Sequence, residues 1–218
     1  MPTIFPASDF TQGSERWFSL RAGIPTASEF SRFLAPDFTL KEPRSKAAKE
    51  AGELNEGIWT YVCEKLAERF SGPLPAFTSF VTEQGKLNES LARKWLAMEC
   101  ETDIQEVAFI KSDDGKCGCS PDGLIGDDEG CEIKCPQTPN QVRYVLEGKL
   151  PEEYVHQVYG SLFVSGRKRW HFLSYFDGYP ALHLVIERDE SIMQRIGEGV
   201  RQFNALLDAA FEKLKKIP

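Results

Sequence analysis

The sequence predicts an α/β protein in which a central mixed β-sheet is flanked by helices, and three observations support this expectation. Strand-like segments gather between residues 106 and 187, whereas helical periodicity dominates both ends of the chain. The 218 residues, 41% hydrophobic and 27% charged, suffice for one core. No apolar run of about 18 residues occurs, so no membrane span is expected. We therefore expect one domain over residues 1–218.

The individual elements follow from local patterns. Amphipathic spacing predicts the helices, and alternation with turn residues between the segments predicts the strands. The last helix, at about 190–215, should pack on the core as part of the same domain. The expected helices are residues 14–22, 47–70, 83–98, 139–147, 152–165 and 190–215, and the expected strands are 106–111, 117–120, 131–135, 169–176 and 181–187.

The stretch Ser120–Pro136 contains the most informative chemistry. Asp122 lies at a bend after a proline, and Glu132 follows ten residues later in the strand-like run C-E-I-K-C. The segment Asp127–Gly130 has hairpin-turn composition and ends in a glycine that tolerates positive φ. A hairpin here would bring Asp122 close to Glu132, with Lys134 on the same strand face as Glu132.

Strand alternation assigns the cysteines of this run to the other face. Cys131 and Cys135 should share an apolar face with Ile133, and buried cysteine commonly behaves as a small hydrophobe. The alternative is a metal-bound cysteine, but Cys117-x-Cys119 and Cys131-x3-Cys135 differ from the usual C-x2-C pairs of zinc sites. The histidines at 156, 171 and 183 have no ligand or triad spacing, so 171 and 183 are expected as ordinary sheet residues.

Two flanking helices present polar side chains on otherwise apolar faces. Glu89 points partly along the face of its helix that carries Ala92 and Leu96. Acids rarely face a core unless they are paired or bind a cation, and a rim pair with Arg93 is the alternative. Gln157 either hydrogen-bonds a metal-bound water or caps a sheet edge.

A possible anion site lies near the N-terminus. Thr26–Glu29 matches a capping box, in which Thr26 caps a helix and Glu29 reaches back. Free amides at a helix start, two hydroxyls and the nearby Arg21 suit a phosphate group. Ordinary capping beside a surface arginine is the alternative reading.

Charge limits the kind of nucleic-acid contact. The net charge of −7 argues against a chain coated by nucleic acid, but it permits a basic channel. The segments Lys41–Lys49 and Arg167–Arg169 are candidates for such a channel, or they are solvated loops. The N-terminus has no basic and apolar leader pattern, so we expect a cytoplasmic protein.

The acids and the lysine together predict hydrolysis of phosphodiesters. Asp122 and Glu132 can hold hard cations through oxygen ligands, and such ions activate water and stabilise a leaving oxygen. Lys134 can orient or deprotonate the attacking water. A D-x9-E-x-K match alone is weak, and its weight comes from the hairpin with Glu89 before it and Gln157 after it.

The chain resembles the lambda exonuclease family of YqaJ-like viral recombinases, in the RecB-like branch of the PD-(D/E)xK nucleases. Its matching pieces run in consistent order between residues 12 and 190, about four-fifths of the chain. The pieces are Trp17, Leu20–Gly23, Thr26–Glu29, Gly85–Lys86 with Glu89, Cys119–Leu124, Glu132–Pro136, Tyr154–Val158, Arg167–Lys168 and Val185–Glu190.

This resemblance implies a restriction-endonuclease-like core and a processive 5′→3′ exonuclease that acts on linear double-stranded DNA, releases mononucleotides and leaves a 3′ single-stranded overhang. It also implies that the cofactor is Mg²⁺, with two ions bound, and that Mn²⁺ can substitute for it. It suggests Asp122, Glu132 and the Ile133 carbonyl as metal ligands, Lys134 as the residue that assists the water, and Glu89 and Gln157 as residues that hold metal-bound waters. It also suggests a pocket for the terminal 5′-phosphate at Arg21 and Ser28, with Thr26 and Ser120 as weaker candidates. Contacts with DNA are suggested for Arg44 and Tyr154.

The resemblance also implies partners and leaves alternatives. It suggests a homotrimeric ring, a single-strand annealing protein as partner, and a phage or prophage origin within a bacterial host. A strand-separating wedge is expected near Phe80–Thr82. The competing hypotheses are a PD-(D/E)xK endonuclease that needs no DNA end and a DNA-binding assembly module with a weakened nuclease centre.

Overall fold

The computed structural model describes residues 1–43, 45–73 and 83–217, with side chains in the last part from residue 88 onward. The predicted DNA contact Arg44 and the predicted wedge at Phe80–Thr82 lie outside these residues. Within the described part, no helix is long and apolar enough to cross a membrane.

The helices largely follow the amphipathic patterns, with one clear exception. The single helix expected over residues 47–70 is wrong: the segment forms two helices, α2 and α3, with a break at residues 51–55. Gly52 adopts φ +69°, and the Asn55 side chain accepts the Gly57 amide at the start of α3, so glycine and cap chemistry divide the pattern. The helices are α1 (Glu15–Arg21), α2 (Lys46–Glu50), α3 (Glu56–Ser71), α4 (Glu83–Glu99), α5 (Thr138–Glu147), α6 (Glu152–Ser165) and α7 (Glu190–Leu214), with the 3-10 helix η1 at Ala27–Arg32.

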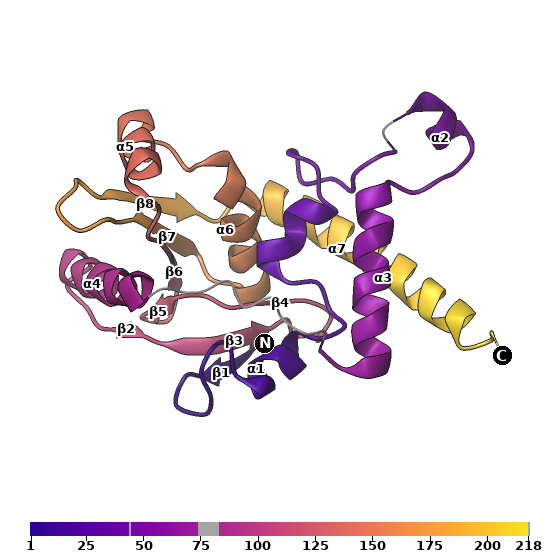
Figure 1. The fold of residues 1–218 in the computed structure, drawn as a ribbon, viewed down its shortest axis with the longest axis horizontal. Helices are drawn as coiled ribbons and strands as arrows, with labels where there is room; N and C mark the ends of the chain where they lie inside the picture. The colour runs from indigo at the N-terminus through magenta and orange to yellow at the C-terminus, as the bar shows by residue number, and fades with distance from the viewer. Residues whose placement is uncertain (44, 74–82, 218) are drawn as a thin grey trace.

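The strands of the described residues form two sheets (Figure 1). The larger has the order β2-β5-β6-β7-β8, in which β6 and β7 are parallel and the other pairs antiparallel, so the predicted mixed sheet is confirmed. The smaller has the order β1-β3-β4, and its first strand was not predicted. The strands are β1 (Thr3–Pro6), β2 (Ile104–Gln105), β3 (Val107–Lys111), β4 (Gly118–Cys119), β5 (Gly123–Ile125), β6 (Glu129–Lys134), β7 (Arg169–Ser174) and β8 (Leu182–Glu187).

The predicted hairpin exists, but its turn lies earlier than expected. Strands β5 and β6 pair with Gly123 opposite Cys131. The turn occupies residues 126–128, and Gly126, at φ +52°, supplies the positive φ. Gly130 instead lies within β6, where a Cβ atom would approach the Trp170 ring to 2.4 Å. The glycine is required there by close packing and not by a turn.

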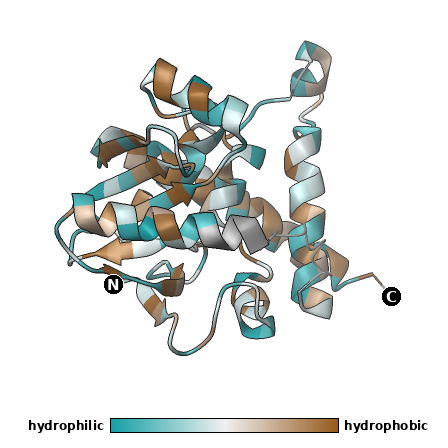
Figure 2. Cartoon of the chain, turned by 60° about the vertical axis from the view of Figure 1, so that its left-hand side comes forward, coloured by the Kyte–Doolittle hydropathy of each residue, from teal (hydrophilic) through white to brown (hydrophobic). Residues whose placement is uncertain are grey.

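Different helices cover the two faces of the larger sheet. Helix α4 packs Ala92 and Leu96 against a small cluster that includes Cys131, Ile133 and Leu173, as the alternation predicted for the cysteine run. Helix α6 lies on the opposite face and joins α3, α7 and η1 in the main core. Figure 2 shows hydrophobic residues on the central strands and alternating with hydrophilic ones along the surrounding helices. This layering leaves polar residues of β6 facing α6.

The N-terminal corner differs from the capping box that the sequence suggested. Residues Ala27–Arg32 form a 3-10 helix, and Thr26 makes no side-chain cap hydrogen bond. Its hydroxyl instead accepts a hydrogen bond from Arg21 at 3.2 Å, and Glu29 pairs with Arg32. The capping prediction is therefore wrong: the Thr26 hydroxyl contacts Arg21 and caps no amide of the 3-10 helix.

Candidate active site

The β5–β6 hairpin brings together the acids and the lysine that the sequence singled out. Asp122, just before β5, accepts the Ile133 amide through Oδ2 at 2.6 Å. On β6, Glu132 Oε1 accepts hydrogen bonds from Lys134 Nζ and from Gln157 Nε2 on α6, both at 2.5 Å. One carboxylate oxygen thus joins the strand to the helix that covers it.

Burial and mutual repulsion shift the pKa values of this group. Burial, followed by repulsion from Glu132, raises the pKa of Asp122 from 3.8 to about 8, although part of the side chain remains accessible. Burial also raises the pKa of Glu132, against the lowering effect of Lys134. Burial lowers the pKa of Lys134, but attraction to Glu132 and Asp122 outweighs it and leaves the pKa raised. One ammonium does not neutralise two crowded carboxyl groups.

The donor set fits a hard divalent cation. Glu132 is only 2% exposed, and its Oε2 atom is buried without a hydrogen-bond partner among the described residues. An orphaned buried carboxylate oxygen is costly unless a cation or ordered water satisfies it. With Asp122 alongside, two carboxylates offer the oxygen ligands that Mg²⁺ prefers. The main-chain carbonyl of Ile133 stays a predicted ligand.

Glu89 lies near this group without bonding to it. Its negative charge contributes to the raised pKa values of both Asp122 and Glu132. Its side chain pairs with Arg93 at 3.0 Å, and Arg93 also contacts Glu106 at 3.1 Å. The ion pair with Arg93 that the sequence offered as an alternative is therefore present, while a role for Glu89 toward a metal-bound water stays a prediction.

The predicted phosphate corner forms around Arg21. The guanidinium donates to the hydroxyls of Ser120 at 3.0 Å, Thr26 at 3.2 Å and Ser28 at 3.4 Å. Burial lowers its pKa, and no carboxylate of the described residues lies within ion-pair distance of it. A partly buried cation surrounded by hydroxyl groups, without an acidic partner, is suited to an anionic ligand.

Trp17 is a part of this corner that the sequence did not reveal. Its Nε1 donates to Ser120 Oγ at 2.9 Å and to the Ala108 carbonyl at 3.1 Å. Its ring lies 4.3 Å below the Arg21 guanidinium. Trp17 therefore holds both the arginine and the serine in place, and no local pattern indicates this.

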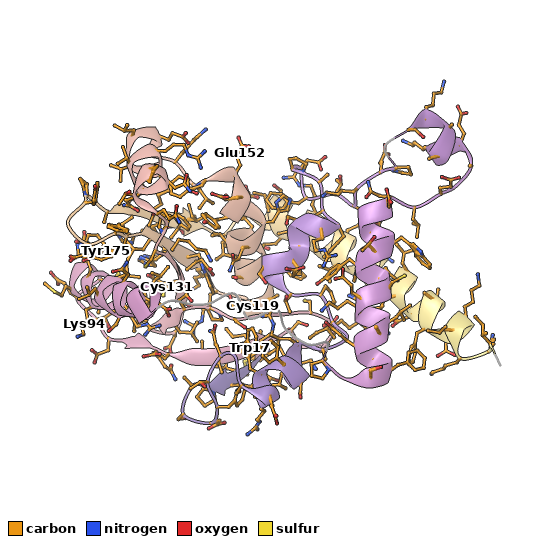
Figure 3. The ribbon with its side chains drawn as sticks, viewed as in Figure 1. Trp17, Lys94, Cys119, Cys131, Glu152 and Tyr175 are labelled. Atoms are coloured by element: carbon orange, nitrogen blue, oxygen red, sulfur yellow. The ribbon has the colours of Figure 1, made fainter. Side chains whose placement is uncertain are left out.

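A single cavity of about 220 Å³ connects the two groups. Figure 3 labels Trp17 and Cys119, two residues of its lining. The lining is polar at both ends and draws on α1, η1, β4, β6 and α6. It consists of Gln12, Trp17, Arg21, Ala27, Ser28, Cys119, Ser120, Asp122, Glu132, Lys134, Gln157 and Ser161.

Tyr154 lies at the edge of the acidic centre. Its ring is 5.1 Å from Lys134 Nζ and packs on Phe172 at 5.4 Å. The ring thus supports the lysine from α6, whereas the contact with DNA predicted for Tyr154 stays a prediction.

Comparison with known protein families shows the family to which the chain belongs. A model of the YqaJ-like viral recombinase domain matches residues 16–168, which include both the Arg21 corner and the acidic hairpin. The chain belongs to the YqaJ-like viral recombinase family. The resemblance inferred from the motifs is therefore confirmed at the level of the family. Among curated proteins, none matches the chain.

Solved structures agree with this membership. The alkaline exonuclease LHK-Exo from Laribacter hongkongensis superposes with a TM-score of 0.76 at 28% identity, over 93% of this chain and 97% of that one. Its complex with dAMP gives a TM-score of 0.75 at 30% identity, with the same coverage. A phage-related exonuclease from Haemophilus somnus 129PT shares the fold, with a TM-score of 0.64 at 16% identity over 88% and 96% of the two chains. The PD-(D/E)xK-like fold class is therefore confirmed.

Proposed function

We propose that this chain is a Mg²⁺-dependent 5′→3′ exonuclease that hydrolyses linear double-stranded DNA to mononucleotides. Membership of the YqaJ-like family and the likeness to alkaline exonucleases support nuclease activity. The observation that carries the finer proposal is the shared cavity, which the Arg21 corner and the acidic hairpin both line. An enzyme that holds a terminal 5′-phosphate beside its hydrolytic centre cuts next to the 5′ end and proceeds toward the 3′ end.

Each side chain has a definite task in this proposal. Asp122 and Glu132, with the Ile133 carbonyl, would hold Mg²⁺, which when bound acts as a Lewis acid on the phosphate and lowers the pKa of a coordinated water. Lys134 enters as an ammonium because its pKa is raised. It therefore orients the water or stabilises negative charge, and is less suited to act as a base. Gln157 holds Glu132 in position through its amide.

The terminal phosphate would be bound by the corner on the other side of the cavity. Arg21 offers its guanidinium, already oriented by stacking on Trp17 and by three hydroxyls. Preorganisation of this kind reduces the ordering cost of binding and favours one orientation of the ligand. The hydroxyls of Ser28 and Ser120 would exchange their bonds to Arg21 for bonds to phosphate oxygens.

The deciding experiment compares DNA ends. Linear duplexes with 5′-phosphate or 5′-hydroxyl ends, each labelled separately at the 5′ and 3′ termini, are digested with and without Mg²⁺ beside a covalently closed circle. We expect Mg²⁺-dependent release of 5′-terminal mononucleotides, slower digestion of 5′-hydroxyl ends and an intact circle. Cleavage of the circle would support the endonuclease alternative, and the absence of any nucleotide release would support the DNA-binding module.

The assembly and the partner are further parts of the proposal. We infer from the family resemblance a ring-shaped homotrimer that threads DNA and passes its 3′ overhang to a single-strand annealing protein. Light scattering of the purified chain should give three times the mass of 24.6 kDa. A monomer across the working concentration range would contradict the ring.

A further inference from the structure

A second group of metal-binding side chains lies away from the acidic centre. His171 on β7, His183 on β8 and Cys100, directly after α4, bring three ligand atoms within 4.8 Å of one another. His171 Nδ1 is 2.9 Å from His183 Nε2 and 3.6 Å from Cys100 Sγ. All three atoms therefore lie within one small volume.

The strand register explains this convergence. His171 pairs with Val185, and Leu173 pairs with His183, so the two histidines are diagonal neighbours on one face of the sheet. Their ring centroids lie 5.1 Å apart, and the ring planes differ by 17°. Cys131, directly opposite His171 on β6, belongs to the cluster under α4, and Figure 3 labels it near that helix. The histidines therefore face α4, on the side opposite Glu132 and Lys134.

Glu129 prepares His171 as a ligand. Its Oε2 lies 2.6 Å from His171 Nε2, and Arg169 holds the other carboxylate oxygen at 2.8 Å. Since a carboxylate accepts, this contact assigns the ring proton to Nε2 and leaves the Nδ1 lone pair directed at His183 and Cys100. Metal-bound histidines commonly donate their second ring N–H to a carboxylate, which fixes the tautomer and the ring orientation.

The cluster is also accessible from solvent. A hollow of about 700 Å³ adjoins it, lined by Glu99, Cys100, Glu129, His171 and His183 among others. An ion can thus enter from solvent, and a water molecule can occupy a remaining coordination position.

We propose that Cys100, His171 and His183 bind one divalent ion of the zinc class, which accepts sulfur and imidazole ligands, with a water molecule as fourth ligand. Tetrahedral zinc geometry separates two nitrogen ligands by roughly 3.3 Å and nitrogen from sulfur by roughly 3.6 Å. The observed 2.9 and 3.6 Å differ from this by a few tenths of an ångström at most. On binding, the Cys100 thiol releases its proton to solvent, and the His183 proton resides on Nδ1, away from the ion.

The ion would link α4, β7 and β8, which otherwise contact one another through side-chain packing. Cys100 follows the end of α4, so the ion would link that helix end to β7 and β8. The same helix carries Glu89, eleven residues earlier, beside the carboxylate centre. The site would thus stabilise the position of α4 without taking part in hydrolysis.

Cobalt(II) provides a direct spectroscopic probe. Co²⁺ added to the full chain should produce a thiolate-to-cobalt charge-transfer band and the visible bands of tetrahedral coordination. Cys100→Ser should abolish the charge-transfer band, and His183→Gln should weaken both sets of bands. Glu129→Ala should weaken Zn²⁺ binding, measured by competition with Co²⁺, by about 10–100-fold.

Matched variants separate this site from other cysteines and from the carboxylates. Cys63 is exposed on α3, Cys135 is partly buried in the cluster under α4, and Asp122→Asn removes a carboxylate of the other centre. All three variants, Cys63→Ser, Cys135→Ser and Asp122→Asn, should keep the charge-transfer band. Absence of the band in the wild-type chain, or its persistence in Cys100→Ser, would overturn the proposal, and thermal unfolding without metal verifies that each variant is folded.

Discussion

Lys134 Nζ lies 2.5 Å from Glu132 Oε1, two residues earlier on the same face of β6. The pair exists because strand side chains alternate, so residues i and i+2 point in the same direction. The Gln157 amide reaches the same oxygen from α6. As a result, Glu132 Oε1 is satisfied within the protein, and Oε2 is the oxygen left for a cation.

Lys134→Ala should lower kcat by roughly 10²–10⁴-fold while binding of duplex DNA in Ca²⁺ persists, because the lysine acts on the reacting water and not on docking. The measurement is single-turnover digestion beside a binding assay. Lys215→Ala serves as the control, since Lys215 is exposed at the C-terminal end of α7 and pairs with Glu212. If Lys134→Ala turned over substrate at the wild-type rate, Lys134 would have no role in the hydrolytic step.

Arg21→Ala should abolish the preference for 5′-phosphorylated ends. Hydrogen bonds to a charged group are worth about 1.5–3 kcal/mol, so the advantage of a 5′-phosphate should fall roughly tenfold to a hundredfold. Rates on 5′-phosphate and 5′-hydroxyl duplexes provide the ratio. Arg16→Ala, on the exposed side of the same helix, should leave that ratio unchanged. If the Arg21→Ala variant still preferred 5′-phosphorylated ends, the phosphate pocket would have to lie elsewhere.

The metal-free protein should lose stability as the pH rises from about 5 to about 9. The pKa of Asp122 is raised to about 8 in the folded chain, mainly by burial and by Glu132. Between the unfolded and folded pKa values the folded state binds more protons, so the free energy of unfolding falls with rising pH. Asp122→Asn is neutral throughout and should flatten this decline.

Urea unfolding in the presence of a chelator, repeated over this pH range, measures the effect. Asp128→Asn provides the control, because Asp128 is exposed on the β5–β6 turn and its pKa is lowered by Lys168. If Asp122→Asn and the wild-type chain showed the same pH dependence, the assigned pKa shift would be wrong.

Gly130→Ala should destabilise the protein by about 1–3 kcal/mol, the usual cost of overpacking. The added methyl group would meet the buried Trp170 ring at 2.4 Å. Gly126→Asn should be nearly neutral, since a Cβ at Gly126 meets nothing within 4 Å and asparagine tolerates the positive φ there. Denaturant midpoints compare the stability of the two variants. Equal stability would contradict the conclusion that packing against Trp170 requires a glycine at position 130.

The acidic centre was accessible to sequence reasoning because its geometry is local. Asp122, Glu132 and Lys134 lie within one hairpin, so turn chemistry and alternation suffice to bring them together. Helix α6 also followed from its periodicity, and its bounds agree with the prediction. The family motifs then extended the interpretation to the Arg21 corner.

The parts that were missed depend on contacts between distant segments. Trp17 reads as an apolar helix residue, and only the fold brings it to Ser120. The histidines at 171 and 183 have no ligand spacing, because strand register and the end of α4 create their cluster with Cys100. Thr26 matches a local cap pattern, but its hydroxyl contacts Arg21 and caps no amide. Local propensity contains no information about such tertiary contacts.

The hairpin and the Arg21 corner also differ in the length of the loop that must close before their contacts can form. The Ile133 amide meets Asp122 across 11 residues, whereas Arg21 meets Ser120 across 99, and the Gly118 amide reaches the Pro25 carbonyl over a similar span. Closing a longer loop costs more chain entropy and slows formation. During refolding, hydrogen exchange should therefore protect the Ile133 amide before the Gly118 amide. The hydrolytic centre would be assembled before the pocket that restricts it to DNA ends, so a late-folding defect would yield a nuclease without end selection.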